Sequence, residues 1–184
     1  FSQEALPEKV RDTTFFTKID SLYREDQFYL AITYNSLFKT PDAFKQNKIP
    51  LGIHAGFLRD MPINKARTFA VGVGLGLSYN KYHQNLLFSE NLEGYDYQIV
   101  DEDVISKNKM ELFYVEVPFE LRWRTSTPES HKFFRIHAGF KLRYLAFSKN
   151  KYVGDFATQI ITNNKDFNKL QYGPTLSMGY NTWN

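Results

Sequence analysis

Seven titratable side chains fall in two stretches of the sequence and are the strongest candidates for chemistry. They are Glu116, Glu120, Arg122, Arg135, His137, Lys141 and Arg143. A carboxylate beside a histidine can act as a general base and acid. The same charges, if they line the interior of a narrow barrel, instead neutralise one another in a structural salt-bridge network. We favour the structural network, and we predict no catalytic residue among them.

Other motifs with a chemical meaning are weak or absent. The histidines, which are His54, His83, His131 and His137, have no partner at the spacing of a metal site. The sequence contains no HExxH, GxSxG or GxxxxGK[ST] motif. The glycines of residues 72–76 recur at a spacing of two within an apolar alternation, which indicates a strand rather than a phosphate-binding loop. We therefore expect no cofactor.

An acidic cluster between residues 90 and 103 could hold calcium. Its members are Glu90, Glu93, Asp96, Asp101, Glu102 and Asp103. Their irregular spacing does not match an EF-hand loop, so a solvated loop is the better interpretation and we expect no metal. The chain has no cysteine, which removes thiolate nucleophiles and disulfides from consideration.

The composition has features of a soluble protein and also features that a soluble core does not explain. The 184 residues include 23 Lys and Arg against 20 Asp and Glu, and the mean hydropathy is -0.45, as in a soluble protein. Yet 17% of the residues are aromatic, more than a core of this size needs. No stretch of roughly 18 apolar residues occurs, which excludes a transmembrane helix but not a transmembrane β-barrel. The net charge of +3 is too small and scattered to indicate a nucleic-acid partner.

Between residues 27 and 182 apolar residues recur at every second position, which is the period of a β-strand. Six runs show this alternation: 27–38, 50–60, 67–82, 110–124, 132–147 and 170–181. Each run has 11 to 16 residues, which exceeds the usual strand of a globular sheet and suits a tilted strand that crosses a bilayer. The alternation therefore predicts an all-β fold of long antiparallel strands.

Short and long connections alternate between the runs, which is typical of an outer-membrane barrel. Residues 61–66 and 125–131 form short turns, whereas the connections at 39–49, 83–109 and 148–169 are longer and polar. Residues 1–26 precede the barrel of residues 27–184, and we expect a short helix near residues 17–24, outside the wall. A strand-like run passes into turn residues just before residue 184, so we expect further sequence beyond it.

The volume of the side chains on each face predicts which face of the strands points outward. One face carries more large apolar side chains than the interior of an eight-stranded barrel can hold, whereas the other carries glycines and charges that suit a tight polar lumen. We therefore predict that the apolar face contacts lipid and that its aromatic residues form girdles at the interfaces. The residues predicted to face lipid are Phe69, Val71, Val73, Leu75, Leu77, Phe113, Val115, Val117, Phe119, Leu121, Trp123, Phe134, Ile136, Phe140 and Leu142.

The runs 110–124 and 132–147 are joined by a short turn and should pair as a hairpin that closes at residues 126–130. This pairing brings Glu116 across from Lys141 or Arg143, and Glu120 near His137. Such partners would neutralise charges held in a narrow lumen.

Two segments resemble a known family. Residues 115–123, VEVPFELRW, place a proline inside a strand, which is unusual because proline is normally expelled from paired strands. This segment is similar to a strand of the Bacteroidetes outer-membrane β-barrel family that includes the PorT/SprT-like proteins. Residues 56–64, GFLRDMPIN, and 72–80, GVGLGLSYN, resemble the PorT/SprT-like members more narrowly. The resemblance covers roughly residues 27–182.

The resemblance implies an eight-stranded, up-and-down barrel of the bacterial outer membrane that belongs to the type IX protein secretion system, which in some bacteria also supports gliding motility. The last two strands of such a barrel are not in this sequence. It implies no catalytic residue, no cofactor and an accessory role through contacts with other secretion components and with outer-membrane lipid. The N-terminus and short turns would be periplasmic and the long loops extracellular. Two alternatives stay open: a soluble or surface ligand-binding barrel, and a lipid-modifying outer-membrane enzyme.

Overall fold

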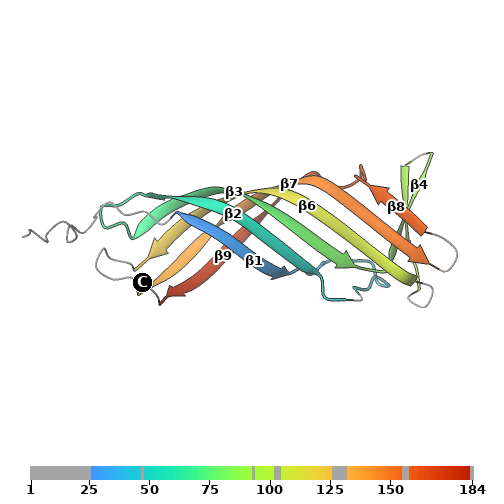
Figure 1. Cartoon of the computed structure of the whole chain (residues 1–184), viewed down its shortest axis with the longest axis horizontal. Helices are drawn as coiled ribbons and strands as arrows, with labels where there is room; N and C mark the ends of the chain where they lie inside the picture. Colours follow the sequence, from blue (N-terminus) through green and yellow to red (C-terminus); the bar gives the residue numbers. More distant parts are fainter. Residues whose placement is uncertain are drawn as a thin grey trace, which may run out of the picture.

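The computed structural model describes residues 26–46, 48–92, 94–101, 105–125, 132–154 and 158–182. In these ranges the strands run obliquely beside one another (Figure 1). They are β1 (Gln27–Tyr34), β2 (Leu51–Pro62), β3 (Phe69–His83), β4 (Leu86–Asn91), β5 (Gly94–Ile99), β6 (Ile105–Arg124), β7 (Phe133–Gly154), β8 (Thr158–Thr162) and β9 (Leu170–Asn181). No described segment forms a helix long and apolar enough to cross a membrane. The helix expected near residues 17–24 and the turn expected at residues 126–130 lie outside the described residues.

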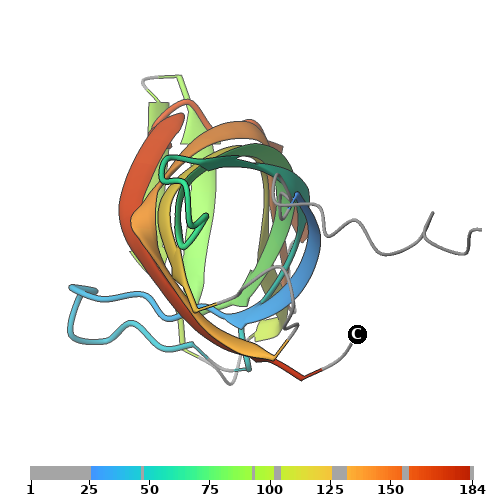
Figure 2. The same ribbon diagram turned by 90° about the vertical axis from the view of Figure 1, so that its left-hand side faces the viewer.

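Seven of the described strands form one antiparallel sheet. Its order is β1-β2-β3-β6-β7, and both β8 and β9 pair with the remaining side of β7. β9 pairs with the first part of β7 as far as Tyr144, and β8 pairs with β7 from Lys149 onward. Viewed along its length, the sheet curls around a central space (Figure 2). The predicted all-β antiparallel class is confirmed, and the described strands form a curled half-barrel.

Each predicted run corresponds to a strand of the curled sheet. β2, β3 and β9 match their runs closely. β1 ends at Tyr34, earlier than the predicted residue 38. Its partner strand supplies the reason, because the residue that precedes Leu51 is Pro50, which has no N–H to donate. Asn35 donates to the Pro50 carbonyl at 3.0 Å, and the ladder stops there.

β7 is longer than predicted because a bulge hides its continuation. Phe113 pairs with Phe147 but Tyr114 pairs with Leu145, so Ala146 is an extra residue in β7. A bulge changes which sequence positions point outward. Before the bulge the even-numbered residues of β7 point outward, and after it the odd-numbered residues do. The sequence alternation breaks at this point, although the strand continues to Gly154.

The long connections contain strands that the alternation did not predict. β4 and β5 pair with each other within residues 83–109, and β8 lies within residues 148–169, so these segments are not plain polar loops. Apolar side chains from β4 and β8 join interior side chains of the curled sheet. The buried cluster comprises Tyr82, Phe88, Met110, Leu112, Tyr114, Leu145 and Ile161. At this end the interior therefore contains a buried apolar cluster, whereas the sequence predicted a polar lumen.

Candidate functional site

The charged interior face of the sheet is the candidate site, and its most buried part is an arginine–aspartate cluster. Asp60 of β2 has no exposed surface, and Arg122 and Arg124 of β6 are each 2% exposed. Arg122 Nη1 lies 3.2 Å from Asp60 Oδ1, and Arg124 Nη1 lies 3.0 Å from Asp60 Oδ2. Arg122 Nε also lies 3.2 Å from Glu120 Oε2. Two carboxylates thus face two guanidinium groups inside the sheet.

A second cluster surrounds Glu116, which is also fully buried. Lys141 Nζ lies 3.0 Å from Glu116 Oε2, and His54 Nδ1 lies 3.2 Å from each carboxylate oxygen. Glu120 Oε2 lies 3.4 Å from His137 Nδ1. The predicted approach of Glu116 to Lys141 and of Glu120 to His137 is confirmed. Because Glu120 also contacts Arg122, His137 is joined to the arginine–aspartate cluster.

Small residues on β3 allow side chains of β2 and β6 to meet, although β3 separates those two strands. Asp60, Gly72 and Glu120 stand opposite one another across the three strands. A Cβ atom added at Gly72 would lie 2.6 Å from Arg122 Nε. The guanidinium therefore reaches Asp60 across a position where any larger residue would displace it.

The other two predicted charges contact β9 and lie apart from these clusters. Arg143 donates to Gln171 Oε1 at 3.1 Å, and its guanidinium carbon lies 4.8 Å from the centre of the Tyr114 ring. Arg135 lies beside Gly179, where an added Cβ atom would be 2.9 Å from Arg135 Nε. The structure thus brings five of the seven predicted side chains together and holds Arg135 and Arg143 against the neighbouring strand.

A hydroxyl, an imidazole and a carboxylate stand in line in the second cluster, as in a hydrolytic triad. Thr33 Oγ1 lies 3.0 Å from His54 Nε2, and His54 Nδ1 faces Glu116. The Thr33 hydroxyl, however, donates its proton to Asn35 Oδ1 at 3.1 Å. The hydroxyl proton therefore points toward Asn35 and not toward His54 Nε2. A general base must accept the hydroxyl proton, so this arrangement positions side chains and does not activate Thr33.

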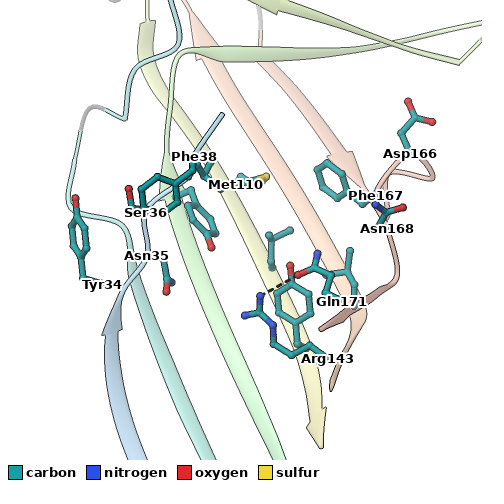
Figure 3. A pocket seen from close by; sticks show the side chains of 15 residues that line it. Tyr34, Asn35, Ser36, Phe38, Met110, Arg143, Asp166, Phe167, Asn168 and Gln171 are labelled. Atoms are coloured by element: carbon teal, nitrogen blue, oxygen red, sulfur yellow. Dashed lines mark hydrogen bonds between the residues drawn. The ribbon is translucent and has the colours of Figure 1, made fainter. Parts of the chain in front are cut away.

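Two cavities lie along the interior face. One of about 800 Å³ adjoins the apolar cluster and is lined by Met110, Leu112 and Phe167, with Arg143 hydrogen-bonded to Gln171 at its edge (Figure 3). The other, of about 510 Å³, lies between β1 and β9 and borders Glu120 and His137. We expected a lumen filled by side chains, and the described residues leave these two spaces in it.

The convex face of the curled sheet is apolar along most of its length. Leu75, Leu121 and Phe134 are exposed by 61%, 65% and 61%, and every residue predicted to face lipid occupies an outward position on β3, β6 or β7. Phe119 and Phe140 stack across two strands with ring centres 5.1 Å apart. Arg59 of β2 is an exposed charge at an outward position. Its long side chain can carry the guanidinium along the wall toward water.

Three residues of the interior network were not predicted from the sequence: His54, Asp60 and Arg124. Each stands on the same face of its strand as residues that were assigned to the interior. His54 alternates with Gly52 and Gly56, and Arg124 follows Glu120 and Arg122 at the same spacing. The alternation of residues along each strand was therefore enough to predict on which face of the sheet these three residues lie. It could not show that they meet, because Asp60 and Arg124 are separated by 64 positions in sequence.

An antiparallel curled sheet with an apolar convex face and a charged concave face has the architecture of a membrane-spanning barrel wall. The family described as "Outer membrane protein beta-barrel domain" matches residues 1–184, and the chain belongs to this family. It is thus a β-barrel protein of the bacterial outer membrane. Neither a curated protein nor a solved structure matches the chain. Among the described residues, no group of three or more histidines and carboxylates could hold a metal ion.

Proposed function

We propose that this chain is a non-enzymatic, PorT/SprT-like accessory component of type IX protein secretion. It acts through contacts with other secretion components in the outer membrane or periplasm. The short turns and the N-terminus face the periplasm, the long connections face the outside, and the apolar convex face contacts lipid.

The observation that carries this proposal is the proline-bearing strand and its effect on the wall. Pro118 lies in β6, between β3 and β7. The pairing of β3 with β6 runs from Phe69 to Val73 and resumes at Gly76, so it is interrupted opposite Val117 and Pro118. A proline in a central strand removes a donor from the ladder. The segment of residues 115–123, which resembles the PorT/SprT-containing family, is therefore a structural feature of the barrel wall.

The interior network supports a role without conduction of cargo. Ion pairs connect β2 to β6 and β6 to β7 across the interior face. Because these side chains occupy the lumen and the larger cavity holds only about 800 Å³, a folded protein cannot pass. Secreted proteins must cross through a larger partner, and this chain assists the assembly, stability or coupling of that partner.

Deletion of the gene tests the proposal. We expect type IX cargo to accumulate inside the cell envelope, and plasmid expression of the unaltered protein to restore export. A variant with the mild interior change Ser177→Thr should restore export equally. Normal export by the deletion strain would refute the proposal, as would passage of folded cargo through the purified protein in liposomes.

A second candidate function is binding of a small amphipathic ligand in the interior cavity near the long connections. The cavity of about 800 Å³ favours it, because apolar side chains line it beside the charge of Arg143. Arg143→Gln should then weaken the binding of fatty-acid probes measured by calorimetry, with Lys65→Gln at the opposite end as a matched control. Equal or absent binding by all three proteins would exclude this candidate.

A further inference from the structure

A basic patch lies on the outer wall, directly beyond a row of aromatic residues. Tyr79 of β3, Phe113 of β6 and Phe147 of β7 stand opposite one another on the convex face. The next outward positions along the same three strands carry Lys81, Glu111 and Lys149, and the positions after those carry His83, Lys109 and Lys151. The outward residue Lys107 follows on β6. We call these seven residues the basic patch.

The charge of the basic patch is strongly one-sided. Five lysines face one carboxylate, that of Glu111, which gives a formal charge of +4. Glu111 is already engaged, because it accepts from the Tyr79 hydroxyl at 2.8 Å and pairs with Lys109. The patch therefore presents a positive field that the strands themselves do not neutralise.

Between the aromatic row and the short turns, the outward residues of the same three strands are uncharged. From the aromatic row toward the short turns, the outward positions of β3, β6 and β7 are apolar and end at Phe69, Trp123 and Phe134. Within β3, β6 and β7 the outward lysines are therefore confined to the ends near the long connections.

The depth of the basic patch matches the headgroup layer of a bilayer. Two residues advance a strand by about 6.8 Å, and a tilt of about 40° leaves about 5 Å along the membrane normal. The polar layer on each side of a bilayer is roughly 5 to 8 Å thick. With the aromatic row at the boundary of the hydrocarbon, Lys81 and Lys149 lie at the level of lipid phosphates. Lys109 and Lys151 lie about 10 Å from the row, just beyond the polar layer, and their flexible side chains can reach back to it.

We propose that the basic patch binds the phosphorylated headgroups of lipids in the leaflet next to the long connections. Lysine suits this role because its ammonium is a compact charge on a flexible stem that can reach a phosphate from the wall. The aromatic row contacts the glycerol or sugar portion of the same lipids, where aromatic side chains prefer to lie. The binding anchors β3, β6 and β7 at a fixed depth and does not depend on the secretion role.

Native mass spectrometry of the full chain folded in detergent micelles tests this proposal. The probes are lipid A, which carries two phosphates, and the same lipid after phosphate removal. We expect retention of lipid A at concentrations where the dephosphorylated lipid is lost. The triple variant Lys81→Gln, Lys149→Gln, Lys151→Gln should bind lipid A more weakly, by about fivefold for each lysine removed. A control with Lys39→Gln, Lys65→Gln and Lys165→Gln changes the same charge outside the patch and should bind as the unaltered protein does.

Equal binding of the two lipids by the unaltered protein would overturn the proposal, and this comparison needs no variant to fold. Displacement of lipid A by millimolar inorganic phosphate alone would overturn it as well, because the site would then recognise a free anion. Unchanged affinity in a patch variant that migrates as a folded barrel on unheated gels would also contradict it.

Discussion

Replacement of Asp60 by asparagine should strongly destabilise the folded protein. Asp60 is fully buried and bridges Arg122 and Arg124 at 3.2 and 3.0 Å. Asparagine has nearly the same shape, so the substitution removes a charge without creating a cavity. Two guanidinium groups, each 2% exposed, then lose the carboxylate between them.

The expected loss follows from the burial of the three groups. Two unit charges about 4 Å apart attract by about 4 kcal/mol at an effective dielectric constant of 20. Breaking one partner of a buried pair costs about 3 to 5 kcal/mol, because an uncompensated charge stays inside. Glu120 keeps its contact with Arg122 at 3.2 Å, which limits the loss of stability caused by the Arg122 charge. We therefore expect Asp60→Asn to lower the free energy of unfolding by about 3 to 5 kcal/mol.

Urea titration in lipid vesicles, followed by tryptophan fluorescence and by migration on unheated gels, measures this loss. Asp42→Asn, an exposed acid in the connection between β1 and β2, is the matched control and should change the free energy of unfolding by at most about 0.5 kcal/mol. Arg124→Met should cost less in the Asp60→Asn background than in the unaltered protein. A loss under about 0.5 kcal/mol for Asp60→Asn would refute the reasoning.

Three further predictions concern the wall, the glycines and the outer hairpin. Val117→Arg on the convex face should cost about 2 to 4 kcal/mol in vesicles, whereas the interior change Ser177→Thr should be mild; equal losses would contradict the outward assignment of Val117. Gly72→Ala should destabilise by about 1 to 3 kcal/mol, since its Cβ would lie 2.6 Å from Arg122 Nε, while Gly173→Ala, with no atom within 4 Å, should be near neutral; the reverse order would refute the crossing of Arg122 over β3. Burial and a hydrogen bond to Asp166 raise the pKa of Tyr97 in β5 above 10.0, so the stability from this contact is present below pH 10 and is lost as the pH rises through the folded pKa. Difference absorbance at 295 nm between the protein and Tyr97→Phe should show this late titration, and a titration at or below pH 10 would contradict it.

The sequence predicted the strands of the wall because their two faces meet different surroundings. A strand between an apolar and a polar environment must alternate, and β3 and β6 do so along most of their length. The pairing of β6 with β7 could be predicted as well, since consecutive strands joined by a short turn form a hairpin. Glu116 and Lys141 therefore met as expected.

The features that the sequence did not predict depend on register and on tertiary packing. The extra residue Ala146 reverses the parity of β7, so alternation alone ends the strand too early. β4 and β8 contribute Phe88 and Ile161 to a buried cluster, but both strands are too short to show a period of their own. Asp60 meets Arg122 only because Gly72 leaves space between β2 and β6, and that depends on the alignment of three strands.

The central claim is that β3, β6, β7 and β9 form a bilayer-spanning wall with one face toward lipid. The absence of cysteine from the chain makes single-cysteine spin labelling straightforward. In vesicles, labels at the outward positions Val73, Val117 and Leu142 should collide readily with dissolved oxygen and poorly with a water-soluble nickel complex. Labels at the inward positions Ser78, Thr175 and Ser177 should show lower oxygen accessibility. Equal accessibility at the two sets of positions, or the opposite order, would contradict the account.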